Sequence, residues 1–363
     1  MALVIGLGVV ASGWGGPLRY AQGLARALAE TGGNRYVVFT NRPSAFTGAG
    51  VEVVEVPSRG GYFEPLWDQL WLPLAARKTR LDLYHGVKGA LPAFLDCAQV
   101  ATVHDLAVHV YPESFSRLQR AYMRFGLRLA VKKASRILTD SAHTKDDLLR
   151  FYGVPPERVV TVPLGVCRRT FFPAEPGCHG VRVRGLEFSE PFFLYAGTVQ
   201  PRKNVDLVVE AFGESGLYPR ARLVVAGRLR PGYHPFWLRE PLPGLHYLGP
   251  VADDTLADLY RRALALVSPS SYEGFGLTLL EAMASGCPVL ALPTSSVPEV
   301  LGDAGFLLPE ASKKALAEGM RRIFEDPGLR RSLRARGLER SLRFDWRETA
   351  RRTAEVYHEV AAK

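Results

Sequence analysis

Short, nearly continuous apolar runs alternate with helical stretches along this 363-residue chain, and the alternation occurs twice. Runs of this kind indicate parallel strands buried on both faces, and the helices between them complete βαβ units. In the first half, the expected strands are residues 3–10, 36–40, 51–56, 81–85, 100–104 and 136–140. In the second half, they are residues 192–196, 221–226, 246–248, 265–268 and 288–291. The pattern predicts an α/β protein with two doubly wound, Rossmann-like sheets in series.

The domain boundaries follow from where the alternation stops. We expect an N-terminal domain over residues 1–170, a linker with prolines and glycines over 171–190, and a C-terminal domain over 191–345. Residues 346–363 are predicted to form a helix that packs back on the N-terminal domain. Ligands of open α/β sheets bind beyond the carboxyl ends of the strands, so two facing sheets would place both sets of loops on one cleft.

The composition is that of an ordinary globular protein, with 47% hydrophobic and 23% charged residues. Four cysteines without a CxxC pair argue against a zinc knuckle or a disulfide framework and fit a reducing cytosol. The net charge of +10 can attract nucleic acid, anionic lipid or phosphorylated substrates, but solvated helix faces give the same charge. Composition therefore leaves the function open.

The strongest motif, EGFGLTLLE, runs from Glu273 to Glu281 and follows a predicted strand where a helix begins. A helix start preceded by glycines presents free N–H groups and a positive dipole end, which suit an anion. The two glutamates are eight residues apart, about two helical turns, so both can bind hydroxyl groups of one extended ligand. In the simpler alternative, Glu273 caps the helix and Glu281 pairs with an arginine.

A second motif, YAGTVQPRKN, occupies residues 195–204 at another strand end before a helix. Gly197 permits close approach of a ligand, and Arg202 and Lys203 supply two adjacent cations. Cations at a helix start are unfavourable by roughly 0.3–1 kcal/mol unless a negative group offsets them. We therefore favour a diphosphate site over a solvated Arg-Lys pair.

These two segments resemble the donor-site motifs of the retaining glycosyltransferases of family 4. Three upstream segments resemble the same family, namely GWGGPLRYAQGLARAL, TVHDL and TDSAHTKDDLLRFYGVPPERVVTVPLGV. The resemblance spans most of the chain in the right order. It implies the GT-B fold, in which two Rossmann-like domains face each other across a cleft.

The resemblance also implies roles for individual residues. Arg202 and Lys203 would neutralise the donor diphosphate, Glu281 would bind the ribose hydroxyls, and Glu273 would contact the donor sugar. The remaining donor-binding positions are Gly15, Gly16, Gly197, Gly274, Phe275, Gly276 and Leu277.

His104, in the TVHDL segment, would lie near the donor sugar and the acceptor hydroxyl, with Asp105 beside it. A lone histidine at a strand end is more often structural, so its catalytic role depends on the resemblance. The mechanism implied is front-face displacement, in which the leaving phosphate accepts the acceptor's proton. We expect catalytic roles for His104, Arg202, Lys203 and Glu273, with no metal and no cofactor besides the nucleotide-sugar donor.

The resemblance favours a hexosyltransferase that uses GDP-mannose, with UDP-sugars next, and a glycan or lipid-linked acceptor. A sugar-phosphate or glucan synthase of the same fold is one alternative. Another is a non-catalytic protein that binds nucleotide sugars or nucleic acid, although no nucleic-acid-binding motif is visible. A nicotinamide-dependent oxidoreductase is disfavoured because GWGGP, not GxGxxG, follows the first strand.

Two segments bear on the acceptor. Residues 62–73 are rich in aromatic side chains, and a helix over residues 117–136 would carry seven basic residues and no acid. We predict one stripe of Arg117, Arg120, Arg124 and Arg128 and another of Leu118, Tyr122, Phe125 and Leu129. A helix packed by its apolar stripe with the arginines in water is the favoured interpretation; contact with an anionic membrane is the alternative. The expected location is cytoplasmic, with peripheral contact at the inner face of the cell membrane under that alternative.

Overall fold

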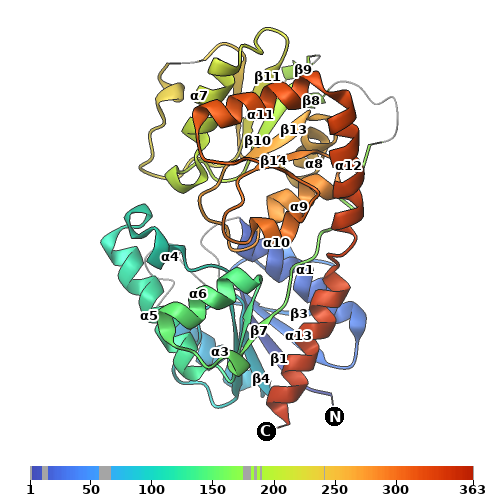
Figure 1. The fold of residues 1–363 in the computed structure, drawn as a ribbon. Coiled ribbons are helices and arrows are strands. Elements are labelled where there is room, and N and C mark those ends of the chain that lie inside the picture. The colour runs from blue at the N-terminus through green and yellow to red at the C-terminus, as the bar shows by residue number, and fades with distance from the viewer. Residues whose placement is uncertain are drawn as a thin grey trace. The chain divides into compact units, whose positions relative to one another are not determined.

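The computed structural model describes residues 2–9, 15–56, 67–174, 181–183, 186–188, 190–240 and 242–362. It divides into two compact units. Unit 1 comprises Met1–Gly165 and Asp345–Lys363, and unit 2 comprises Val166–Phe344. Each unit is built around a parallel sheet with helices beside it (Figure 1). The predicted α/β class with two Rossmann-like domains is confirmed.

The sheet of unit 1 has the strand order β3-β2-β1-β4-β5-β6-β7, and all its neighbouring strands are parallel. The order runs outward in both directions from β1, as expected of a doubly wound fold. Its strands are β1 (Val4–Val9), β2 (Arg35–Thr40), β3 (Glu52–Glu55), β4 (Leu83–Gly86), β5 (Ala98–Val103), β6 (Arg136–Thr139) and β7 (Val159–Thr161).

The helices of unit 1 begin where the sequence supplies a start signal. Pro17 lies in the first turn of α1, where its missing N–H costs nothing, and Ser116 and Ser141 cap α5 and α6. A π-helical segment, Trp67–Trp71, leads into α3. The α-helices are α1 (Gly16–Thr31), α3 (Leu72–Thr79), α4 (Ala107–Val110), α5 (Arg117–Lys133), α6 (Ala142–Tyr152) and α13 (Trp346–Ala361).

The C-terminal helix α13 belongs to unit 1 and packs along α1 (Figure 1). Glycines make room for its first residue. A Cβ on Gly23 of α1 would come within 2.4 Å of the Trp346 ring, and one on Gly165 would come within 2.1 Å of the Trp346 backbone nitrogen. Side chains at these two positions would displace the helix, so Gly23 and Gly165 determine where α13 docks.

The sheet of unit 2 has the order β12-β11-β10-β13-β14-β15 and is also parallel throughout. Its central strand β10 is buried along its whole length, which explains the continuous apolar run FFLYA. The strands are β10 (Phe192–Ala196), β11 (Arg222–Ala226), β12 (Leu245–Gly249), β13 (Ala265–Ser268), β14 (Val289–Ala291) and β15 (Phe306–Leu307).

The boundary between the units falls between Gly165 and Val166, five residues before the expected end of the first domain. Part of the segment predicted as a linker carries an antiparallel hairpin, β8 (Val181–Val183) with β9 (Leu186–Phe188), that belongs to unit 2. The helices of unit 2 are α7 (Val205–Ser215), α8 (Asp253–Arg262), α9 (Leu277–Ala284), α10 (Val297–Leu301), α11 (Lys313–Glu325) and α12 (Pro327–Ser341).

Each unit has its own hydrophobic core. In unit 1 the core includes Val37, Val103 and Ile137, and in unit 2 it includes Phe193 and Val267, all of them at most 1% exposed. Across the described ranges, no helix has the length and apolarity needed to span a membrane.

Candidate functional site

The first group of candidate residues follows β10 and β13, which are neighbours in the sheet of unit 2. Because these strands are parallel, the loops after their carboxyl ends meet at one edge. The backbone N–H of Ser271 donates to the carbonyl oxygen of Arg202 at 2.9 Å, and Nδ2 of Asn204 donates to the carbonyl oxygen of Pro269 at 2.7 Å. The structure thus joins the two motifs singled out in the sequence.

Lys203 and Glu273 form an ion pair at this junction, in which Nζ donates to Oε1. The two side chains are only 16% and 11% exposed. Nη1 of Arg202 donates to the carbonyl oxygen of Tyr272 at 2.7 Å. Burial alone would raise the pKa of Glu273, but the charges of Lys203 and Arg202 more than offset it, so this pKa lies below its ordinary value. Glu273 is therefore ionised and paired at neutral pH.

The sequence did not predict that Lys203 and Glu273 bind each other. Their pairing fixes both charges independently of any ligand and leaves Arg202 as the neighbouring cation. The Nε atom of Arg202 is buried and has no hydrogen-bond acceptor among the described residues.

Arg230, which the sequence reasoning missed, adds a third cation in this region. Nη1 of Arg230 donates to Oε1 of Gln200 at 2.8 Å. Burial, followed by the charge of Arg202, lowers the pKa of Arg230. Arg230 follows β11 at the same sheet edge, and that position after a strand is the signal that could have identified it.

The helix α9 begins beside these cations without a side-chain cap. Its N-cap residue is Gly276, with φ 99°. The N–H of Leu279 already donates to the carbonyl oxygen of Gly276 at 3.0 Å, so the N–H groups of Leu277 and Thr278 are the ones in the first turn that can face a ligand. Glu281 lies in the second turn of α9 and is 3% exposed. Phe275 is buried in an edge-to-face contact with Phe344, so only its backbone can serve a ligand.

The backbone around Glu273 is held from both sides. The N–H of Glu273 donates to Oγ of Ser295 at 2.7 Å, and Oγ of Ser296 donates to the carbonyl oxygen of Glu273 at 2.9 Å. Ser295 and Asn204 both have positive φ, at 48° and 53°, and with Arg80 they are the non-glycine residues of the described chain that do so. Left-handed backbone at non-glycine residues is strained and gathers at functional sites.

Gly197 has φ 140°, and its carbonyl oxygen lies where a Cβ on Gly227 would be, 1.7 Å away. The loops after β10 and β11 can therefore approach each other only because Gly227 has no side chain, whereas Gly197 is required for its positive φ. This explains in physical terms why Gly197 stands in the predicted motif.

The second group of candidate residues lies in unit 1, where His104 follows β5. Its Nδ1 lies 2.6 Å from Oδ2 of Asp140, and its Nε2 lies 2.8 Å from the carbonyl oxygen of Val87. Burial alone would lower the pKa of His104, but Asp140 and the other acceptors outweigh burial, so the pKa is raised. The Asp105 carboxylate accepts the N–H of Ala107 at 3.0 Å and forms a local turn. Asp140 was not predicted as a site residue.

The His104 ring packs edge-to-face on Tyr20 of α1, with ring centroids 4.8 Å apart. The Tyr20 hydroxyl is 2.9 Å from Oγ1 of Thr102, which is 2.7 Å from Nε2 of His85. Nδ1 of His85 is 2.6 Å from the hydroxyl of Tyr357 on α13. These four side chains are almost fully buried, so they link the C-terminal helix to the strand that precedes His104.

Gly15 and Gly16 lie at the start of α1, where Gly15 is the N-cap residue. A Cβ on Gly15 would meet nothing within 4 Å, so the space beside it is open. The residues between β1 and Gly15 lie outside the described part of the chain, as do residues 62–66 of the aromatic segment.

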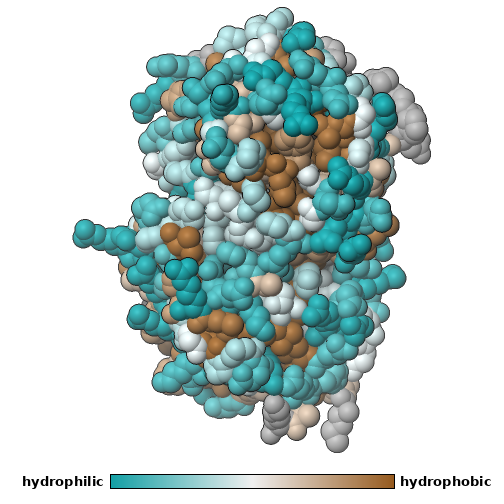
Figure 2. All heavy atoms as spheres, viewed as in Figure 1, coloured by the Kyte–Doolittle hydropathy of each residue, from teal (hydrophilic) through white to brown (hydrophobic). Residues whose placement is uncertain are grey.

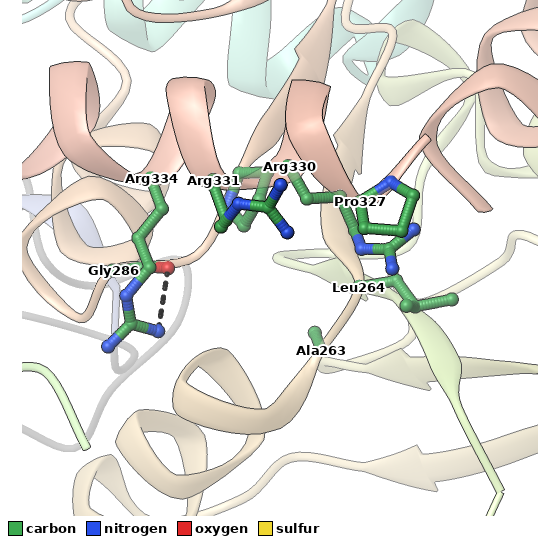
Figure 3. Close-up of a pocket in the computed structure, with 8 residues that line it drawn as sticks. Ala263, Leu264, Gly286, Pro327, Arg330, Arg331 and Arg334 are labelled. Atoms are coloured by element: carbon green, nitrogen blue, oxygen red, sulfur yellow. Dashed lines mark hydrogen bonds between the residues drawn. The ribbon is translucent and has the colours of Figure 1, made fainter. Parts of the chain in front are cut away.

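A cavity of about 290 Å³ in unit 2 (Figure 3) is lined by Ala263, Leu264, Gly286, Pro288, Pro327, Arg330, Arg331 and Arg334. Leu264 and Pro288 directly precede β13 and β14, so the cavity lies at the amino edge of the sheet, opposite the candidate residues. Arg330 binds two carbonyl oxygens at the end of α11, and Arg334 contacts that of Gly286 just past α9. Arg330 and Arg334 therefore stabilise the C-terminal ends of helices and are not part of the candidate site.

Comparison with known proteins assigns both halves of the chain. The model of the family described as Glycosyl transferases group 1 matches residues 182–340, and that of Glycosyltransferase Family 4 matches residues 14–168. O-antigen chain mannosyltransferase B of Escherichia coli is 32% identical over 303 residues, which cover 80% of this chain and 76% of that protein. A D-inositol 3-phosphate glycosyltransferase of Streptomyces bingchenggensis is 32% identical over 323 residues, which cover 83% and 68%.

Solved glycosyltransferase structures share the fold at low sequence identity. HepE of Anabaena, solved in complex with UDP and glucose, has a TM-score of 0.79 at 18% identity, with 98% of this chain and all of that chain covered. WaaG, a glycosyltransferase involved in lipopolysaccharide biosynthesis, has a TM-score of 0.76 at 21% identity, with 97% and 99% covered. The two parallel-sheet units are therefore those of the GT-B fold.

We predict that Lys203→Met lowers the free energy of unfolding by about 3 kcal/mol at pH 7, because Glu273 would lose its buried partner. A carboxyl whose pKa is depressed by folding stabilises the protein above its unfolded pKa of about 4.3, and this stability is lost as the pH falls through the folded pKa. The cost of the substitution should therefore shrink at pH 3.5. Urea unfolding at both pH values measures the difference in the free energy of unfolding between the variant and the wild type. The control is Lys314→Met, an exposed position, which should change stability by less than about 0.5 kcal/mol. An equal cost at both pH values would contradict the pairing.

Proposed function

This chain belongs to the group 1 glycosyltransferases, and from that premise we propose that it transfers a hexose from a nucleotide sugar to a glycan or lipid-linked acceptor with retention of configuration. The observation that carries the proposal is the charge arrangement at the carboxyl edge of unit 2. Arg202, Lys203 and Arg230 lie there beside the uncapped start of α9. This is the chemistry that a diphosphate requires.

The same arrangement gives each residue a role in the proposed reaction. Arg202 and the start of α9 bind the diphosphate and stabilise the negative charge that grows as the nucleotide leaves. Lys203 adds its charge and holds Glu273 in place for the donor sugar. Glu281, buried one turn further along α9, binds the ribose hydroxyls. Because Arg202, Arg230 and the start of α9 already stabilise the diphosphate, we propose that transfer needs no metal ion.

GDP-mannose is the donor we favour, and UDP-sugars come next. The E. coli relative is named a mannosyltransferase, which supports a mannosyl donor. HepE was solved with UDP and glucose, and it is similar in fold but not closely related in sequence. The choice of base and sugar therefore depends on measurement.

A nucleotide-release assay with a panel of GDP-, UDP- and ADP-sugars in the presence of EDTA tests the donor proposal. We expect wild-type protein to release nucleotide from one donor class, and Glu281→Ala to lose at least 90% of that activity because the ribose hydroxyls lose their acceptor. Glu210→Ala, an exposed residue of α7, is the matched control and should keep the wild-type rate. No release from any donor, together with no thermal shift from any nucleoside diphosphate, would refute the proposal.

For the acceptor, the outer face of α5 supports contact with an anionic, lipid-bearing surface. Leu118 and Phe125 are 60% and 59% exposed, and Arg117 and Arg128 beside them are exposed as well. Arg124 is instead partly buried, and its Nη2 contacts the carbonyl oxygen of Val108 at 3.4 Å. The helix packs on its core as predicted, but through Leu127 and Ala130, and Leu118 and Phe125 of the predicted apolar stripe face solvent.

A second set of exposed apolar residues lies on α3, on the segment that precedes it and in the loop between β4 and β5. Leu70, Trp71 and Leu74 are about half exposed, and Phe94 is 76% exposed. Two hydrogen bonds of Gln69 connect the segment before α3 to the loop that contains Phe94. Its Nε2 donates to the carbonyl oxygen of Leu91, and its Oε1 accepts from the N–H of Ala93. In the view of Figure 2, hydrophobic side chains form separate patches among hydrophilic ones.

Sedimentation with liposomes tests this contact. We expect binding to anionic vesicles at low salt, weak binding to neutral vesicles, and a roughly tenfold loss of partitioning for Leu118→Gln combined with Phe125→Gln, because two exposed apolar groups no longer insert. Leu342→Gln, an exposed leucine of unit 2, should bind like the wild type. Absence of binding to anionic vesicles at low salt would rule the contact out.

A further inference from the structure

The ring of His104 has a hydrogen-bond acceptor at each nitrogen. The carbonyl oxygen of Val87, 2.8 Å from Nε2, can only accept, so Nε2 carries a proton. On the other side, Oδ2 of Asp140 lies 2.6 Å from Nδ1. If the ring were neutral and Asp140 ionised, the lone pair on Nδ1 would face a lone pair on Oδ2 with no proton between them. The pair must therefore hold one further proton, either on the ring or on the carboxyl.

Burial raises the pKa of Asp140, but the charge and the hydrogen bond of His104 act in the opposite direction, and two further features favour the proton on the ring. Asp140 follows β6 and directly precedes Ser141, the N-cap residue of α6, where the helix dipole stabilises a negative charge. Asp105 is a second carboxylate near the His104 ring and stabilises a positive charge there. Among the residues that the structure describes, the other titratable groups that interact with the ring are His85, whose pKa burial lowers, and Tyr20. Two carboxylates thus surround one imidazole.

The ring is also held in this orientation. Tyr20 packs edge-to-face against it, and the Tyr20 hydroxyl is fixed by Thr102. Oγ1 of Thr144 donates to the carbonyl oxygen of His104 at 3.2 Å and fixes the backbone of the same residue. A flip of the imidazole would replace both nitrogens by carbons and break both hydrogen bonds.

We propose that Asp140 is a positioning residue that keeps His104 doubly protonated, so that His104 serves the transfer as a fixed cation and never as a base. The proposal deepens the glycosyltransferase function proposed above and rests on it for the reaction. A doubly protonated ring has no lone pair to accept the proton of the acceptor hydroxyl. The bond from the anomeric carbon to the diphosphate oxygen breaks, the bond to the acceptor oxygen forms, and the acceptor's proton passes to the departing diphosphate.

His85 provides an internal comparison. Its two nitrogens lie 2.6 Å and 2.7 Å from the hydroxyls of Tyr357 and Thr102, and a hydroxyl can donate or accept. Burial, followed by the charge of His104, lowers the pKa of His85 to about 3. The two histidines, both inside unit 1, should therefore carry different numbers of ring protons at the same pH.

Nitrogen NMR of the full-length protein with ¹⁵N-labelled histidine rings tests the proposal without any donor. The signals are assigned from His104→Gln and His85→Gln. At pH 7.5 we expect two protonated ring nitrogens for His104 and one for His85. A singly protonated His104 in the wild-type protein would overturn the proposal. This readout needs no transferase activity, so its outcome is independent of whether the proposed function holds.

The variant Asp140→Asn then tests the role of the carboxylate. Removing its charge lowers the pKa of His104, so we expect a singly protonated ring at pH 7.5 in this variant. In the transferase assay we expect a 10- to 100-fold lower kcat, with the alkaline fall of the pH profile displaced to lower pH. Asp146→Asn, an exposed aspartate of α6, should leave the ring signals, kcat and pH profile unchanged. An Asp140→Asn protein that keeps both ring protons, or keeps wild-type kcat and pH profile, would contradict a positioning role.

Discussion

The ion pair between Lys203 and Glu273 connects two loops that are 70 residues apart in the sequence. It forms because β10 and β13 are adjacent and parallel, so their carboxyl ends deliver both loops to the same edge of the sheet. The serine and asparagine hydrogen bonds around it hold the strained backbone at Asn204 and Ser295. Arg202 and the start of α9 owe their positions to this junction, and the proposed diphosphate site depends on it.

Unit 1 relies on a different kind of interaction. Its buried polar chain runs from Tyr357 through His85 and Thr102 to Tyr20, whose ring packs against His104. Every member has a hydrogen-bond partner, so burial of these polar groups carries little penalty. The C-terminal helix α13, although last in the chain, thereby supports a residue near the middle of the first half.

Much of this arrangement could be predicted from local sequence. Continuous apolar runs predicted the strands, since strands covered on both faces need no polar residues. The glycines and charges after strands predicted where Arg202, Lys203 and Glu281 would lie. His104 was identified only through the resemblance to family 4, because a single histidine at a strand end has no distinguishing local pattern.

The rest required knowledge of contacts between distant segments. The pairing of Lys203 with Glu273 depends on strand order, which the sequence does not state. Asp140 stands in a segment that looks like an ordinary helix start, and only its distance to His104 marks it. The exposure of Phe125 could not be read from helical periodicity, because periodicity identifies two faces of a helix without saying which one the sheet covers.

The central claim is that the edge of unit 2 around Arg202 is a nucleoside-diphosphate site, and equilibrium binding tests it most directly. Calorimetric titration of GDP, GMP, UDP and UMP measures how much the second phosphate adds to the binding affinity. The titration is done with the wild-type protein and with Arg202→Gln. We predict that the preferred diphosphate binds at least tenfold more tightly than its monophosphate, and that Arg202→Gln removes most of this difference because a charged hydrogen bond is lost. Equal affinities for diphosphate and monophosphate in the wild type, or an unchanged difference in the variant, would contradict the claim.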